Sequence, residues 1–112
     1  METPWAVTPE KVEAALKKIV EVSKPRKLIL FGSYVAGTVK RNSDLDVLVV
    51  TGADVENPRK ESVRIRRALK GISMSVDILV VSERVLDACA DAPGLIYREA
   101  LRKGKVVYES AA

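Results

Sequence analysis

Three aspartates and a Gly-Ser pair have the residue types and spacing expected of a metal and phosphate site. Gly32-Ser33 ends one apolar run, and Asp44 and Asp46 open the next after ten intervening residues. Side chains two apart in a strand point to the same face, with Cα atoms about 6.5–7 Å apart, so these two carboxylates can converge on one cation. Asp77 lies early in a third apolar run. It joins the pair if the two strands are neighbours in a sheet.

An all-oxygen ligand set favours Mg²⁺, or Mn²⁺, over zinc. Close carboxylates repel and raise each other's pKa, and a divalent cation removes that repulsion. Mg²⁺ takes only one or two protein carboxylates and completes its shell with water and substrate phosphate, so an incomplete protein cage implies a nucleotide. Gly32 allows the backbone to approach a phosphate, and Ser33 offers a hydroxyl and an N–H at a possible helix start. Lys40 and Arg41 are further candidate phosphate contacts.

The surrounding sequence predicts an α/β (α+β) fold, with a small mixed sheet of three to four strands and helices packed on it. Strands are expected over residues 27–31, 44–50, 75–81 and 105–108. Thr8-Pro9 begins a first helix that Pro25 prevents from continuing, because proline lacks an N–H. Asn57-Pro58 begins a second helix, with Gly71 expected as its stop. Further helices are expected over residues 82–91 and 95–103.

The second helix has an apolar side and a strongly basic remainder. Its buried side is expected to contain Ile65, Ala68 and Leu69. The other faces carry many cations against the single acid Glu61: Arg59, Lys60, Arg64, Arg66, Arg67 and Lys70. These cations either form a solvated face, favoured near the helix C-terminus by the dipole, or a dock for phosphate or an acidic partner.

Length and composition indicate one domain spanning residues 1–112, with 47% hydrophobic and 30% charged residues. The apolar runs are too short to span a bilayer, no secretory signal is recognised, and the single Cys89 agrees with a reducing compartment. We therefore expect a cytoplasmic protein. A net charge of +4 and a pI near 9.3 are compatible with anionic partners or with no specific partner. Direct nucleic-acid binding is not expected, because no arginine-rich tract, aromatic platform or zinc spacing is present.

Taken together, the motifs resemble the nucleotidyltransferase superfamily of DNA polymerase beta. The likeness is to its small prokaryotic members, the minimal nucleotidyltransferases (MNT), including the MntA-like antitoxins of HEPN/MNT modules. The family pattern is an apolar residue, Gly-Ser, about ten residues, Asp-x-Asp, and a later Asp on a neighbouring strand. Phe31, Gly32-Ser33, Asp44, Asp46 and Asp77 match it in order, and the resemblance covers essentially the whole chain.

The resemblance implies Mg²⁺-dependent transfer of AMP from ATP to a hydroxyl of a partner protein, with release of pyrophosphate. Gly32 and Ser33 would hold the triphosphate, and Asp44 and Asp46 would bind Mg²⁺. Asp77 would bind a second ion and help activate the acceptor hydroxyl. The implied partner is a helical HEPN-type toxin, adenylylated on a tyrosine. The nucleotide preference and the oligomeric state, including a homo-oligomer, stay open.

One position departs from the family pattern. Many relatives have Gly-Ser-x-Ala-Arg-Gly, whereas Ala36 stands here where the arginine is usual. The change removes a cation near the phosphates, and Lys40 and Arg41 are the candidates to replace it. The alternative function is therefore a non-catalytic or weakly catalytic antitoxin that neutralises its partner by binding.

Overall fold

The predicted order of helices and strands is confirmed wherever the chain is described. The computed structural model describes residues 8–32, 35, 44–52, 57–72, 74–89 and 102–110. Most of the helix predicted over residues 95–103 lies outside these ranges, as does Ala36. Helix α1 spans Pro9–Ser23, and the Thr8 side chain accepts a hydrogen bond from the Lys11 N–H at 3.3 Å. This is the hydroxyl cap followed by proline that the sequence predicts.

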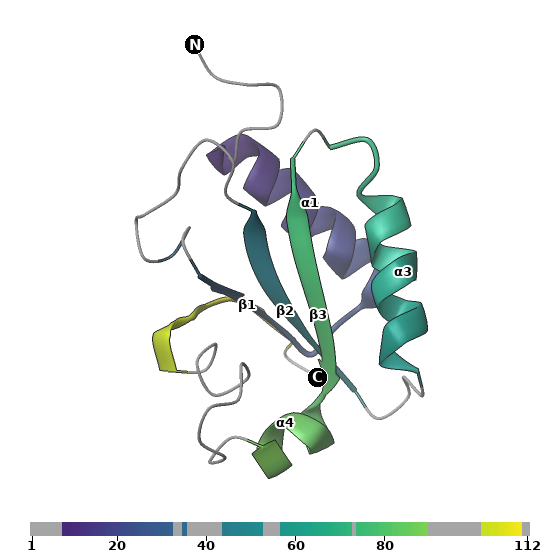
Figure 1. Ribbon diagram of the computed structural model, residues 1–112, viewed down its shortest axis with the longest axis vertical. Coiled ribbons are helices and arrows are strands. Elements are labelled where there is room, and N and C mark those ends of the chain that lie inside the picture. Colours follow the sequence, from purple (N-terminus) through teal and green to yellow (C-terminus); the bar gives the residue numbers. More distant parts are fainter. Residues whose placement is uncertain are drawn as a thin grey trace.

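Four strands form one mixed sheet in the order β3-β2-β1-β4 (Figure 1). They are β1 Lys27–Phe31, β2 Leu45–Thr51, β3 Val76–Ser82 and β4 Lys105–Glu109. Strand β1 runs antiparallel to both β2 and β4, whereas β2 and β3 are parallel. A parallel pair needs a crossover connection, and helix α3, Pro58–Ala68, lies in the segment that joins β2 to β3. The sheet has therefore the size and mixed character that the sequence predicts.

Each face of the sheet carries a cluster of buried side chains, and β2 contributes to both. Val47 and Val49 belong to the cluster beneath α1 and α3, while Leu48 and Val50 belong to a second cluster. That second cluster includes Leu86 of helix α4, Glu83–Cys89, which begins where the Val85 N–H donates to Ser82 Oγ at 3.2 Å. Burial on both faces explains why β2 is continuously apolar from Val47 to Val50 rather than alternating.

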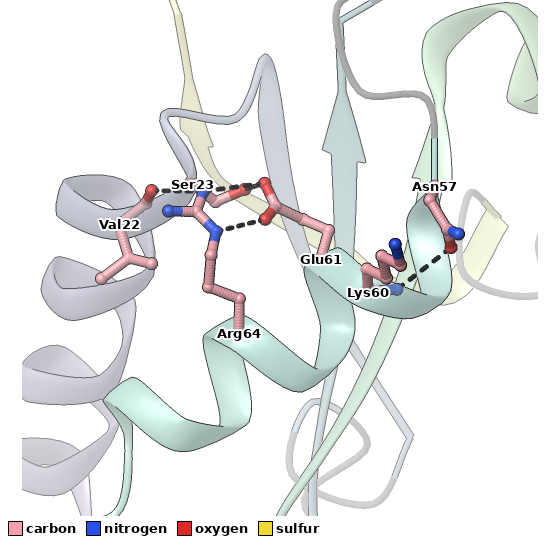
Figure 2. Close-up of polar contacts among 6 residues, drawn as sticks. All are labelled: Val22, Ser23, Asn57, Lys60, Glu61 and Arg64. Carbon is pink, nitrogen blue, oxygen red and sulfur yellow. Dashed lines mark hydrogen bonds and ion pairs between the residues drawn. The ribbon is translucent and has the colours of Figure 1, made fainter.

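Helix α3 is held to α1 by a polar contact as well as by apolar packing (Figure 2). The Glu61 carboxylate accepts from Arg64 Nε at 2.7 Å and from Ser23 Oγ at 2.9 Å. Arg64 also donates to the Val22 carbonyl oxygen at 2.8 Å. These four residues therefore link α3 to the end of α1. Glu61 is only 8% exposed, so this acid is part of an interhelical contact and not of a solvated basic face.

The second helix ends earlier than Gly71 suggests. Its last helical residue is Ala68, and Leu69 caps it, with backbone bonds to the carbonyls of the preceding turn. Ile65 and Leu69 are buried and Ala68 is half-buried, which confirms the predicted inward side. Among the described helices, none is long and apolar enough to cross a membrane.

Candidate active site

Asp46 and Asp77 stand opposite each other on the two parallel strands. In the β2–β3 register Asp46 pairs with Asp77, and in the β1–β2 register Phe31 pairs with Asp46. Aligned residues of neighbouring parallel strands share a face, and such strands lie about 4.8 Å apart. The strands that carry Asp46 and Asp77 are therefore neighbours, as a shared site for the three acids requires. By strand alternation, both acids share the face of Leu48 and Val50.

Gly32 lies against the Asp46 side chain, at the end of β1. It follows Phe31 at the end of β1 and has φ +77°, a conformation that side-chain-bearing residues rarely adopt. A Cβ atom built on Gly32 would overlap the Asp46 carboxylate and lie 3.1 Å from its Cγ. The backbone of Gly32 therefore passes directly against the Asp46 side chain, and only glycine fits there without displacing it.

The Asp46 carboxyl group is electrostatically disfavoured in its charged form. Partial burial raises its pKa, and the nearby Asp77 and Asp44 carboxylates raise it further. Asp44 itself precedes the first residue of β2 and is exposed. Two acids thus act on a third, partly buried one, and the Asp46 carboxyl group gains stability from a cation or a proton. This is the electrostatic situation expected of a cation site before the cation binds.

A cation from α3 already reaches this group of acids. Arg66 Nη2 lies 3.5 Å from Asp77 Oδ1, and both side chains are more than half exposed. Exposed pairs of this kind add little to stability, so the contact matters chiefly for its position. The sequence places Arg66 among the cations of the helix and gives no link between it and Asp77. The available signal was that α3 ends shortly before the strand that carries this acid.

The donor chemistry fits Mg²⁺, although the described residues contain no ready-made metal cage. No group of three His, Cys, Asp or Glu side chains within the described ranges is tight enough to enclose an ion. Mg²⁺ commonly uses one or two carboxylates and retains water, so a partial set of oxygen ligands suits it. The predicted phosphate contacts Ser33, Lys40 and Arg41 lie outside the described residues and stay predictions, as do the metal-ligand roles of the three acids.

Comparison with known proteins decides the family. Residues 10–112 match the family described as "Polymerase beta, Nucleotidyltransferase", which is nearly the full length of the chain. The chain belongs to the polymerase beta nucleotidyltransferase family. The family resemblance drawn from Gly32, Asp44, Asp46 and Asp77 is therefore confirmed, whereas the individual roles of these residues are not tested by it.

Solved structures with the same fold include members of this nucleotidyltransferase class. A protein assigned as a nucleotidyltransferase from Sulfolobus solfataricus has a TM-score of 0.60 at 17% identity, over 89% of this chain and 78% of that one. A toxin–antitoxin structure with AMP-PNP has a TM-score of 0.54 at 25% identity, over 88% and 74%.

A third structure is the toxin–antitoxin MntA-HpeT in a mutant form with two Asp-to-Glu substitutions two residues apart. It has a TM-score of 0.58 at 21% identity, over 94% of this chain and 76% of that one. No protein of curated function matches the sequence. These neighbours agree with a minimal nucleotidyltransferase fold.

Proposed function

We propose that the protein transfers AMP from ATP to a hydroxyl group of a partner protein in a Mg²⁺-dependent reaction, and that it acts in this way as an antitoxin. The observation that carries the proposal is the pairing of Asp46 with Asp77 beside Gly32. Family membership supplies the reaction class. The likeness to toxin–antitoxin structures, one of them with AMP-PNP, supports the partner and the nucleotide.

In the proposed reaction the acceptor hydroxyl oxygen attacks the α-phosphorus of ATP. The bond from the α-phosphorus to the bridging oxygen breaks, and pyrophosphate leaves. Asp77, on the edge strand β3, would take part in removing the hydroxyl proton. Asp44 and Asp46 would hold Mg²⁺, which when bound neutralises the carboxylates and the phosphate charge. Gly32 would let the triphosphate approach the backbone.

The partner is proposed to be a helical HEPN-type toxin that supplies the acceptor, a tyrosine hydroxyl. Transfer of AMP would add a negatively charged group to that hydroxyl and change its hydrogen bonding. Ser33, Lys40 and Arg41 are proposed to contact the phosphates. Lys40 or Arg41 would supply the charge that Ala36 does not.

Labelled ATP tests the proposal directly. Wild-type protein, Mg²⁺ and a helical HEPN-type partner should give label on the partner, measured after denaturing electrophoresis. Asp46→Asn should lower transfer by at least about 100-fold, because it removes a charge on which the reacting phosphate and its cation depend. Asp87→Asn is the matched control, since Asp87 is an exposed acid on α4, away from the paired acids. Equal labelling by wild type and Asp46→Asn would overturn the catalytic proposal.

The second candidate function is neutralisation by binding alone. Its motivation is Ala36, which stands where relatives carry an arginine. Under this alternative, Asp44→Asn/Asp46→Asn would still neutralise the partner in a growth assay although AMP transfer is lost. Failure of that double variant to neutralise, with binding to the partner retained, supports the enzymatic function instead.

A further inference from the structure

A shallow groove of about 320 Å³ lies between helix α3 and the outer side of β3. Its α3 side includes Arg59, Val63 and Arg66, and its β3 side includes Leu79 and Val80. Val63 is 45% exposed, which is high for a large apolar side chain. The groove thus combines exposed apolar surface with two cations.

We propose that this groove is the docking site for the acceptor protein, and that it takes an acidic, extended segment that adds along the outer edge of β3. The inference deepens the proposed function, on which it rests for the identity of the segment as acceptor. The class of partner follows from three properties of the groove: its open backbone, its charge and its position beside Asp77.

Within the described part of the chain, no strand pairs with the outer edge of β3. β3 is the first strand in the order β3-β2-β1-β4, and within the described residues it pairs only with β2. A seven-residue edge strand presents a row of N–H and C=O groups to any extended chain that approaches it. Peptides that bind by strand addition use such groups for affinity and side-chain pockets for specificity.

The charge of the groove selects an acidic segment. Arg59 and Arg66 are exposed, and the described residues that line the groove include no acid. Within the described part of the chain Arg59 forms no ion pair, and its side chain is exposed. The same lining residues include no aromatic side chain. Single-stranded nucleic acid is bound by stacking on aromatic rings as well as by charge, so a protein segment fits this groove better.

The groove leads to the candidate catalytic acid. Arg66 both lines the groove and pairs with Asp77 at 3.5 Å. Asp77 directly precedes Ile78, the first β3 residue that lines the groove. A segment laid along this edge would therefore extend to Asp77 and bring its own hydroxyl groups to the paired acids.

Fluorescence anisotropy with a short labelled peptide of alternating Glu and Val tests the inference, with a Lys/Val peptide of equal length as the opposite-charge control. The acidic peptide should bind in the absence of ATP and Mg²⁺. Val63→Asp and Arg59→Glu should each weaken binding at least about tenfold, because each places a carboxylate in the groove. Val85→Asp and Arg67→Glu are matched controls and should change binding by less than about twofold. Val85 is also 45% exposed but lies on α4, and Arg67 is an exposed α3 cation outside the described lining of the groove.

Three results would each overturn the inference. They are equal binding of the acidic and basic peptides, equal losses in the groove variants and their controls, and displacement of the acidic peptide by a single-stranded oligonucleotide that binds more tightly. Circular dichroism on every variant verifies that folding is retained. Because neither nucleotide nor metal is present, a negative result leaves the AMP-transfer proposal standing. Conversely, equal labelling by wild type and Asp46→Asn would overturn the AMP-transfer proposal but would not change the peptide-binding result.

Discussion

Replacing Gly32 by alanine should destabilise the fold by about 1.5–3.5 kcal/mol, in two separable parts. The first part is the backbone, because a residue with a Cβ at φ +77° costs about 1–2 kcal/mol. The second part is the overlap with the Asp46 carboxylate, which must leave its place. Holding that side chain away from its preferred rotamer costs about 0.5–1.5 kcal/mol. For a domain of this size the sum lowers the melting temperature by roughly 10 °C.

Thermal and denaturant unfolding, followed by circular dichroism, separate the two parts in a double-mutant cycle. In an Asp46→Ala background the carboxylate is gone. The Cβ of residue 46 would then lie 3.4 Å from the Cβ that Gly32→Ala adds, which is an ordinary contact. The cost of Gly32→Ala should then fall to the backbone part, which gives a coupling of about 1 kcal/mol. Gly71→Ala is the matched control. Nothing lies within 4 Å of its added Cβ and its φ is not positive, so the change should be neutral or stabilise the fold by up to about 1 kcal/mol.

Two results would refute the reasoning. One is a Gly32→Ala cost no larger than that of Gly71→Ala. The other is the same Gly32→Ala cost with and without the Asp46 carboxylate, because the close approach of the two would then not matter for stability.

Two further predictions concern charge. Because the pKa of Asp46 is raised in the fold, its ionised form disfavours folding above that pKa, and its unfavourable contribution is lost as the pH falls. Asp46→Asn should therefore raise the melting temperature at neutral pH without metal and abolish any rise caused by Mg²⁺; an unchanged Mg²⁺ response contradicts the assignment. The pKa of Glu61 is lowered from 4.5, chiefly by the hydrogen bond from Arg64, so its stabilisation is present above 4.5 and lost as the pH falls through the folded value. Glu61→Gln should cost about 1–2 kcal/mol at neutral pH and little in acid, measured by urea unfolding at both pH values. A cost independent of pH would exclude the ion pair as its cause.

Local signals in the sequence predict most of the fold, because they depend on neighbours along the chain. Thr8 and Asn57 cap the helices that were expected to follow them. The unbroken apolar run in β2 reflects burial on both faces. The shared face of Asp46 and Asp77 also follows from alternation, but only once the two strands are known to be neighbours in register.

What the sequence does not predict depends on contacts between distant segments. Glu61 reads as a surface acid among cations, yet its partner Ser23 lies on another helix. Arg66 reads as one cation of several, and nothing in its local sequence selects Asp77 as its partner. The positive φ of Gly32 is typical of a turn, but its contact with Asp46 arises only when β1 and β2 pair. Such contacts are set by the tertiary arrangement.

The one-sided pairing of β3 has a consequence for how the domain opens. Strands β1 and β2 each pair with two neighbouring strands, whereas β3 pairs, within the described residues, only with β2, and it packs against α3 and α4. An edge strand leaves a sheet by breaking one ladder of backbone hydrogen bonds, whereas a central strand must break two, so an edge opens at lower free energy. We therefore expect α3 and β3 to exchange their amide hydrogens as one cooperative unit, earlier than β1 and β2. Asp77 would leave Asp46 in the same event, so local unfolding of this edge would dismantle the candidate active site while the remainder of the sheet stays folded.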